Sequence, residues 1–88
     1  NGNMVSGTIE EETCAALEAV KQVLADAGCT MEDVVKVTAF LEDARDFGRY
    51  NGVFRQFFPE GRIARSTVEA RPVIATKIEI ECIAYKPL

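Results

Sequence analysis

Histidine is absent from this chain of 88 residues, and cysteine is sparse, with only three residues. The lack of histidine excludes catalytic triads, general bases and metal sites that are built on an imidazole. Cys14, Cys29 and Cys82 are odd in number, and no two of them stand at metal-ligand spacing, so neither a disulfide framework nor a metal cofactor is expected. Any catalysis must use carboxylates, arginine, hydroxyls, thiols, backbone groups or water. Such cysteine usage predicts a reducing, cytoplasmic location.

Long apolar runs are also missing. None approaches the roughly 18 residues that a membrane helix needs, so we expect no membrane partner. The net charge is −4, with 14 acidic against 10 basic residues, which argues against a general affinity for nucleic acid. Length and composition predict one domain, 1–88. The chain opens on the turn pair Asn1-Gly2 rather than on methionine, and we therefore expect further sequence upstream.

The first third of the chain has the pattern of an amphipathic helix. Thr8 and Glu11 stand at the N-cap and N3 positions of a capping box. Apolar or small residues then recur at spacings of three and four, typical of one helix face. Gly28 follows as a stop. The pattern predicts a helix over 9–27.

A second helix is predicted over 44–58, with Asp43 as its N-cap and Pro59-Glu60-Gly61 as its end. Phe47, Phe54 and Phe58 form an apolar stripe along it. Asn51 interrupts that stripe where an apolar residue is expected. A buried amide needs hydrogen-bond partners, so Asn51 is either a structural tie to neighbouring backbone or a pocket residue.

Three further segments predict strands. Residues 34–41 are β-branched and apolar on both faces, typical of an interior strand. Residues 64–70 and 77–85 alternate in polarity, and we expect these two strands to pair with each other as a hairpin. The order helix, strand, helix, strand, strand predicts an α+β fold with both helices on one face of a mixed sheet. Three strands are few for two helices, a second sign of strands upstream.

One strand face carries the chemistry-bearing side chains. Arg65, Thr67 and Glu69 share a face of the first strand, and Glu79 and Glu81 share a face of the next. An arginine fork suits the bidentate binding of a carboxylate or phosphate, and a nearby glutamate can act as a general base towards water. The alternative is a cross-strand salt bridge on a solvated face, which contributes little stability.

Taken together, these segments resemble one known family. DVVKVTAFLED (33–43), ARSTVE (64–69) and IEIECIA (78–84) follow in the order found in the reactive-intermediate deaminase (Rid) family, also called YjgF-like proteins or endoribonuclease L-PSP. The resemblance covers almost the whole of this chain. The family's first two strands have no counterpart in it. The resemblance implies a chorismate-mutase-like α+β fold, assembled as a homotrimer with ligand clefts between subunits.

The resemblance also implies an activity and a site. Family members hydrolyse 2-imino acids such as 2-iminobutanoate and 2-iminopropanoate to 2-keto acids and ammonia, with no cofactor. The arginine that grips the substrate carboxylate falls on Arg65, the glutamate proposed to orient water falls on Glu79, and the helix asparagine falls on Asn51. Thr67 stands where many members have a pocket cysteine, and Ile63 where they have proline.

Three functions stay open at this point. The first is the imine deaminase that the resemblance implies. A second is a non-catalytic trimeric protein that binds or senses a small 2-imino or 2-keto acid, since a fold does not fix a function. A ribonuclease or translation inhibitor is a third, which the acidic charge and the lack of histidine disfavour.

Overall fold

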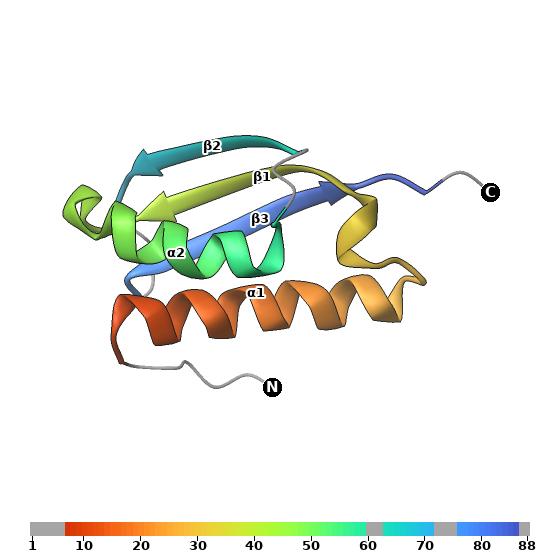
Figure 1. Cartoon of the computed structure of the whole chain (residues 1–88), viewed down its shortest axis with the longest axis horizontal. Coiled ribbons are helices and arrows are strands. Elements are labelled where there is room, and N and C mark those ends of the chain that lie inside the picture. The colour runs from red at the N-terminus through yellow and green to blue at the C-terminus, as the bar shows by residue number, and fades with distance from the viewer. Residues whose placement is uncertain (1–6, 60–62, 72–75, 87–88) are drawn as a thin grey trace.

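The computed structural model describes residues 7–59, 63–71 and 76–86. Their order is helix, strand, helix, strand, strand, as the sequence pattern predicts, with a short 3₁₀ turn before each of β1 and α2 (Figure 1). The main elements are α1 (Ile9–Asp26), β1 (Val34–Leu41), α2 (Phe47–Phe57), β2 (Ala64–Glu69) and β3 (Ile78–Ala84).

The helix α1 begins and ends where its local chemistry requires. The Thr8 hydroxyl accepts from the Glu11 amide at 3.2 Å, and the Glu11 carboxylate accepts from the Thr8 amide at 2.9 Å. This reciprocal capping box satisfies amide groups that have no partner inside the helix. Beyond the C-cap Ala27, Gly28 has φ +80°, a conformation that glycine adopts without strain.

The helix α2 confirms the second predicted helix, except that residues 44–46 form a 3₁₀ turn before it. The Asp43 carboxylate caps this turn by accepting from the Arg45 amide at 2.9 Å. The guanidinium of Arg45 also binds this carboxylate and lowers the pKa of Asp43 to about 2. Of the predicted helix end, Glu60 and Gly61 lie outside the described residues.

The strand order is β2-β1-β3, with β1 parallel to β2 and antiparallel to β3. The predicted hairpin between residues 64–70 and 77–85 is therefore wrong, because β1 lies between them. The reason is the crossover: α2 carries the chain back over the sheet, so β2 enters parallel to β1 at one edge. The other edge of β1 is then left for β3.

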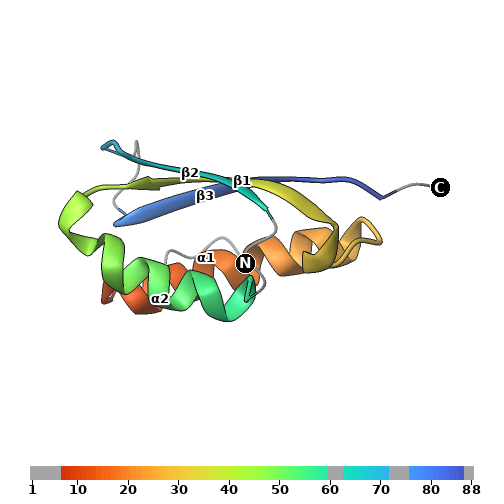
Figure 2. The ribbon, with the colours of Figure 1, turned by 45° about the horizontal axis from the view of Figure 1, so that its top comes forward.

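Both helices cover the same face of the sheet, as predicted (Figure 2). The side chains that point towards them form the core, among them Val37, Leu41 and Ile78. The opposite face, which we call the open face, carries no helix among the described elements. Val68 is 45% exposed and Ile83 60% exposed there.

The cysteines divide between core and surface. Cys29 and Cys82 are partly buried and pack against the core, and burial raises the pKa of the Cys82 thiol. The usual burial of free cysteine predicts a core position for Cys14 in the first helix, but Cys14 is exposed. Its neighbour Thr13 is fully buried instead and donates to the Ile9 carbonyl at 2.6 Å.

Candidate functional site

Arg65 lies on β2, at the edge of the sheet, and points to the helix-covered face. Its register partner on β1 is the buried Val37, which fixes that direction. The guanidinium lies over the Phe54 ring of α2, with 4.5 Å from its central carbon to the ring centroid, and 6.0 Å from the Phe47 centroid. A cation over an aromatic face is attracted by the electron density of the ring. The two rings of α2 therefore fix the position of the guanidinium, which comes from β2.

Asn51 is the hydrogen-bond partner of this guanidinium. Its Oδ1 accepts from Arg65 Nη1 at 2.5 Å. The amide that interrupts the phenylalanine stripe thus binds the side chain of Arg65 rather than neighbouring backbone. Because Asn51 stands one turn before Phe54 and Arg55 on α2, the same helix face supplies both the amide and the ring that fix Arg65.

A cavity of about 400 Å³ opens beside this pair. Polar and apolar groups both contribute to its wall, and the polar side chains come from α2 and β2. The described residues that line it are Asn51, Phe54, Arg55, Phe58, Pro59, Ile63 and Arg65. Sites for small molecules typically have a volume of about 300–1,000 Å³. This cavity therefore matches a small metabolite.

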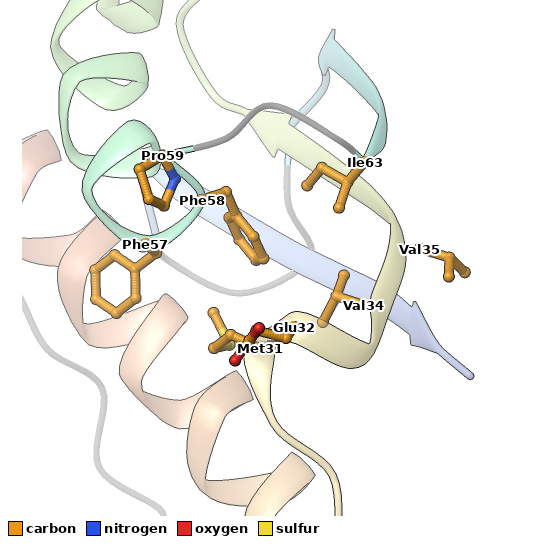
Figure 3. Close-up of a pocket in the computed structure, with 8 residues that line it drawn as sticks. All are labelled: Met31, Glu32, Val34, Val35, Phe57, Phe58, Pro59 and Ile63. Carbon is orange, nitrogen blue, oxygen red and sulfur yellow. The ribbon is translucent and has the colours of Figure 1, made fainter. Parts of the chain in front are cut away.

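A second cavity of about 280 Å³ adjoins the first, since Phe58, Pro59 and Ile63 line both. In Figure 3 the Phe58 side chain extends from the end of α2 towards Val34 at the start of β1. More of the wall of this second cavity is apolar than polar, and Glu32 is its one charged residue among those described. Phe58 and Ile63 form the partition between the two spaces.

Thr67 and Glu69 lie on the same side of β2 as Arg65, as the alternation predicted, and that side faces the helices. Each of the two has its own partner. The Thr67 hydroxyl lies 3.4 Å from the hydroxyl of the fully buried Tyr50. Glu69 Oε1 accepts from the Ala44 amide at 2.7 Å, at the start of the turn that leads into α2. These contacts tie β2 to the region of α2. Neither residue lines the cavity beside Arg65 in the described part of the structure.

Glu79 lies on the other face of the sheet. It pairs with Phe40, and its neighbour Ile78 is buried under the helices beside Leu41. Because side chains alternate along a strand, Glu79 and Glu81 point to the open face while Arg65 points to the helices. Within one chain the structure therefore does not bring Arg65 and Glu79 together, and the expectation that they share a face across a hairpin is wrong.

Glu12 is a buried carboxylate that the sequence reasoning did not single out. It is 5% exposed and accepts from the Lys77 amide at 2.8 Å, the Thr76 hydroxyl at 3.0 Å, Lys77 Nζ at 3.2 Å and the Gly7 amide at 3.3 Å. Burial raises the pKa of Glu12, but these hydrogen bonds outweigh that effect and hold the pKa below its usual 4.5. Its spacing of three residues after the buried Ile9 was the available signal.

Over 7–59, 63–71 and 76–86, no cluster of three cysteine, aspartate or glutamate side chains is arranged to hold a metal ion. Within the same ranges, neither helix has the length and apolar character needed to cross a bilayer.

Comparison with known proteins shows the family to which this chain belongs. The profile of the family described as endoribonuclease L-PSP matches residues 1–86. A RutC family protein of Pyrococcus abyssi is 43% identical over 97% of this chain and 68% of its own length. A crystal structure of a Thermotoga maritima protein, 42% identical, superposes with a TM-score of 0.92 over 99% of this chain and 69% of its own.

The chain therefore belongs to the endoribonuclease L-PSP family, the Rid or YjgF-like proteins. A human relative, 38% identical over 98% of this chain and 64% of its own length, is named 2-iminobutanoate/2-iminopropanoate deaminase. The chain thus spans about two thirds of the length of these relatives.

Proposed function

We propose that this chain contributes to the hydrolysis of small 2-imino acids to 2-keto acids and ammonia, with Arg65 as the carboxylate-binding residue. The observation that carries the proposal is the fixed guanidinium beside a cavity of metabolite size. A guanidinium offers paired N–H donors to a carboxylate, and Asn51 and Phe54 limit its freedom before the ligand arrives. The deaminase name of the human relative supports the same reaction.

In the proposed reaction, water adds to the imine carbon and its oxygen forms the new C–O bond. The C–N bond then breaks, and the nitrogen leaves as ammonia after taking up protons from the water. Arg65 holds the substrate carboxylate and so fixes where the imine carbon lies, which is a gain from positioning. Thr67 offers a hydroxyl on the same strand face. Glu79 accepts a proton from the attacking water or holds that water by a hydrogen bond.

Because Glu79 and Arg65 lie on opposite faces of one sheet, we propose that they meet only between copies of the chain. A cyclic trimer places the open face of one copy against the next and gives each cleft an arginine from one copy and a glutamate from its neighbour. The exposed apolar side chains of Val68 and Ile83 on the open face support such contact. We further propose a cytoplasmic location, although two relatives in fission yeast are named as mitochondrial proteins.

Coupling to threonine dehydratase tests the activity. The protein should accelerate the release of 2-ketobutyrate beyond the rate with dehydratase alone. Arg65→Ala removes a charge-assisted pair of hydrogen bonds and should lower kcat/KM by on the order of 100-fold. The matched control is Arg45→Ala, because Arg45 pairs with Asp43 at 2.7 Å and does not line the cavity. No acceleration by the unaltered protein, or an equal rate with Arg65→Ala, contradicts the proposal.

Mixing two inactive variants tests the shared site. Arg65→Ala and Glu79→Gln should each be nearly inactive alone, whereas Glu81→Gln, on the same open face, should retain activity. When the two variants assemble at random on co-expression, half of the arginines and half of the glutamates are intact, so about a quarter of all clefts should regain both. If mixed trimers regain no activity, the cleft does not draw these two residues from different copies.

A non-catalytic binder is the second candidate. The observation that favours it is again the separation of Arg65 from Glu79, because a single chain has the proposed carboxylate-binding arginine without Glu79 beside it. Binding of 2-ketobutyrate with no turnover in the coupled assay is the result that this candidate requires. RNA cleavage is disfavoured by the net charge of −4. Only cleavage that survives repurification and is lost in Arg65→Ala favours it.

A further inference from the structure

Arg55 is a second arginine on the wall of the cavity beside Arg65. It lies on α2, four residues after Asn51, and so presents to the same side of the helix. The two charged groups among the described lining residues are both guanidinium groups. In a chain with 14 acidic and 10 basic residues, two cations at one small cavity are an unusual local excess of positive charge.

The other two arginines near α2 are engaged elsewhere. Arg45 Nη2 pairs with Asp43 at 2.7 Å, and Arg49 Nη2 pairs with Glu10 at 2.8 Å. Neither lines the cavity. Arg45 and Arg49 thus form surface ion pairs, whereas Arg55 and Arg65 both line the cavity. The wall between them also offers the apolar side chains of Phe54, Phe58 and Ile63 to the carbon chain of a ligand.

We propose that Arg55 binds a second carboxylate, so that this cavity selects dicarboxylic 2-imino acids and the matching 2-keto diacids over monocarboxylic ones. The proposal rests on the proposed role of Arg65, which holds the carboxylate next to the imine carbon. The side-chain carboxylate of the same ligand then reaches Arg55, while its methylene groups contact the apolar wall. Paired guanidinium–carboxylate hydrogen bonds make such a contact directional as well as attractive.

Two keto acids that differ by the second carboxylate test the proposal without requiring turnover. Titration calorimetry gives the dissociation constants of 2-oxoglutarate and of 2-oxobutanoate, which is the 2-ketobutyrate of the coupled assay. Both titrations are run at one fixed ionic strength, because salt screens exposed charges. The unaltered protein should bind 2-oxoglutarate about tenfold more tightly, which corresponds to about 1.4 kcal/mol. Arg55→Gln should remove this preference and leave the affinity for 2-oxobutanoate within about twofold. Arg55→Lys should keep part of it, and Arg45→Gln should keep all of it.

The outcomes separate this proposal from the function on which it rests. Equal affinity for the two acids, or a preference that survives Arg55→Gln, overturns the role of Arg55 even when imine hydrolysis is observed. A preference that depends on both Arg55 and Arg65 supports the diacid site even when no imine is hydrolysed, in which case only the reaction is wrong. If neither acid binds, both proposals fall.

Discussion

Replacing Glu12 should destabilise the protein more than replacing any exposed glutamate of α1. Glu12 joins the start of α1 to the entry of β3, since three of its four hydrogen bonds come from Thr76 and Lys77. In Glu12→Ala the amide of Lys77 loses its acceptor in a part-buried setting. A hydrogen bond to a charged group contributes about 1.5–3 kcal/mol, and a buried group left unpaired costs a similar amount.

The magnitude follows from what each donor can do next. The Lys77 side chain is 43% exposed, so its ammonium can return to water and does not become a buried unpaired charge. The loss should therefore lie at the lower end of the range for broken buried pairs, about 3 kcal/mol. For a domain of this size that lowers Tm by on the order of 15 °C. Glu12→Gln keeps the shape and one acceptor oxygen, and should cost about half as much.

The pH dependence gives an independent check. The folded-state pKa of Glu12 lies below its usual value of 4.5. A carboxyl with a depressed pKa contributes stability above the unfolded-state pKa, and this contribution is lost as the pH falls through the folded-state pKa. The stability difference between the unaltered protein and Glu12→Gln should therefore shrink as the pH falls from the usual pKa of 4.5 through the lower folded-state pKa of Glu12.

Urea unfolding at several pH values measures both effects, at one protein concentration because assembly shifts apparent stability. Glu18→Ala is the matched control, since Glu18 is an exposed glutamate on the same helix. If Glu12→Ala and Glu18→Ala differ by less than about 0.5 kcal/mol, Glu12 does not fasten α1 to β3. A difference that stays constant with pH contradicts the assigned cause of the pKa shift.

Two further predictions concern the ends of elements and the open face. Thr8→Ala removes the side-chain half of the capping box and should cost about 1 kcal/mol in urea unfolding, whereas Thr8→Ser should be nearly neutral. Ile83→Asp places a charge on the open face and should reduce the oligomeric mass measured by light scattering, while the circular dichroism spectrum stays unchanged. An unchanged mass with Ile83→Asp contradicts the proposal that the open face packs against another copy.

Features that depend on local chemistry could be predicted from the sequence. The capping box at Thr8, the positive φ of Gly28 and the bounds of β1 (Val34–Leu41) are confirmed because each depends on residues within a few positions. The placement of Arg65 and Thr67 on one and the same side of β2 also followed from alternation. Asn51 was recognised as an anomaly, and the structure supplies its partner.

Features that depend on distant neighbours could not be predicted in the same way. Alternation assigns a face within one strand, but it does not say which strand lies alongside. The hairpin between β2 and β3 was the shortest connection and was wrong, because β1 occupies the position between them. Glu12 illustrates the same limit: it is one of three consecutive glutamates in α1, and only its contact with Lys77, 65 residues away, distinguishes it.

This topology has a consequence for how binding and turnover depend on assembly. The cavity beside Arg65 is lined by residues between 51 and 65, so the described wall comes from α2, from the start of β2 and from Phe58, Pro59 and Ile63 between these two elements. In the proposed reaction Glu79 comes instead from the open face of a neighbouring copy. A change that weakens assembly should therefore lower kcat while the affinity for a keto acid is largely retained. In Ile83→Asp, a lower kcat with unchanged keto-acid affinity would indicate a catalytic cleft shared between copies. If each chain completes its site alone, the variant should change neither kcat nor the affinity.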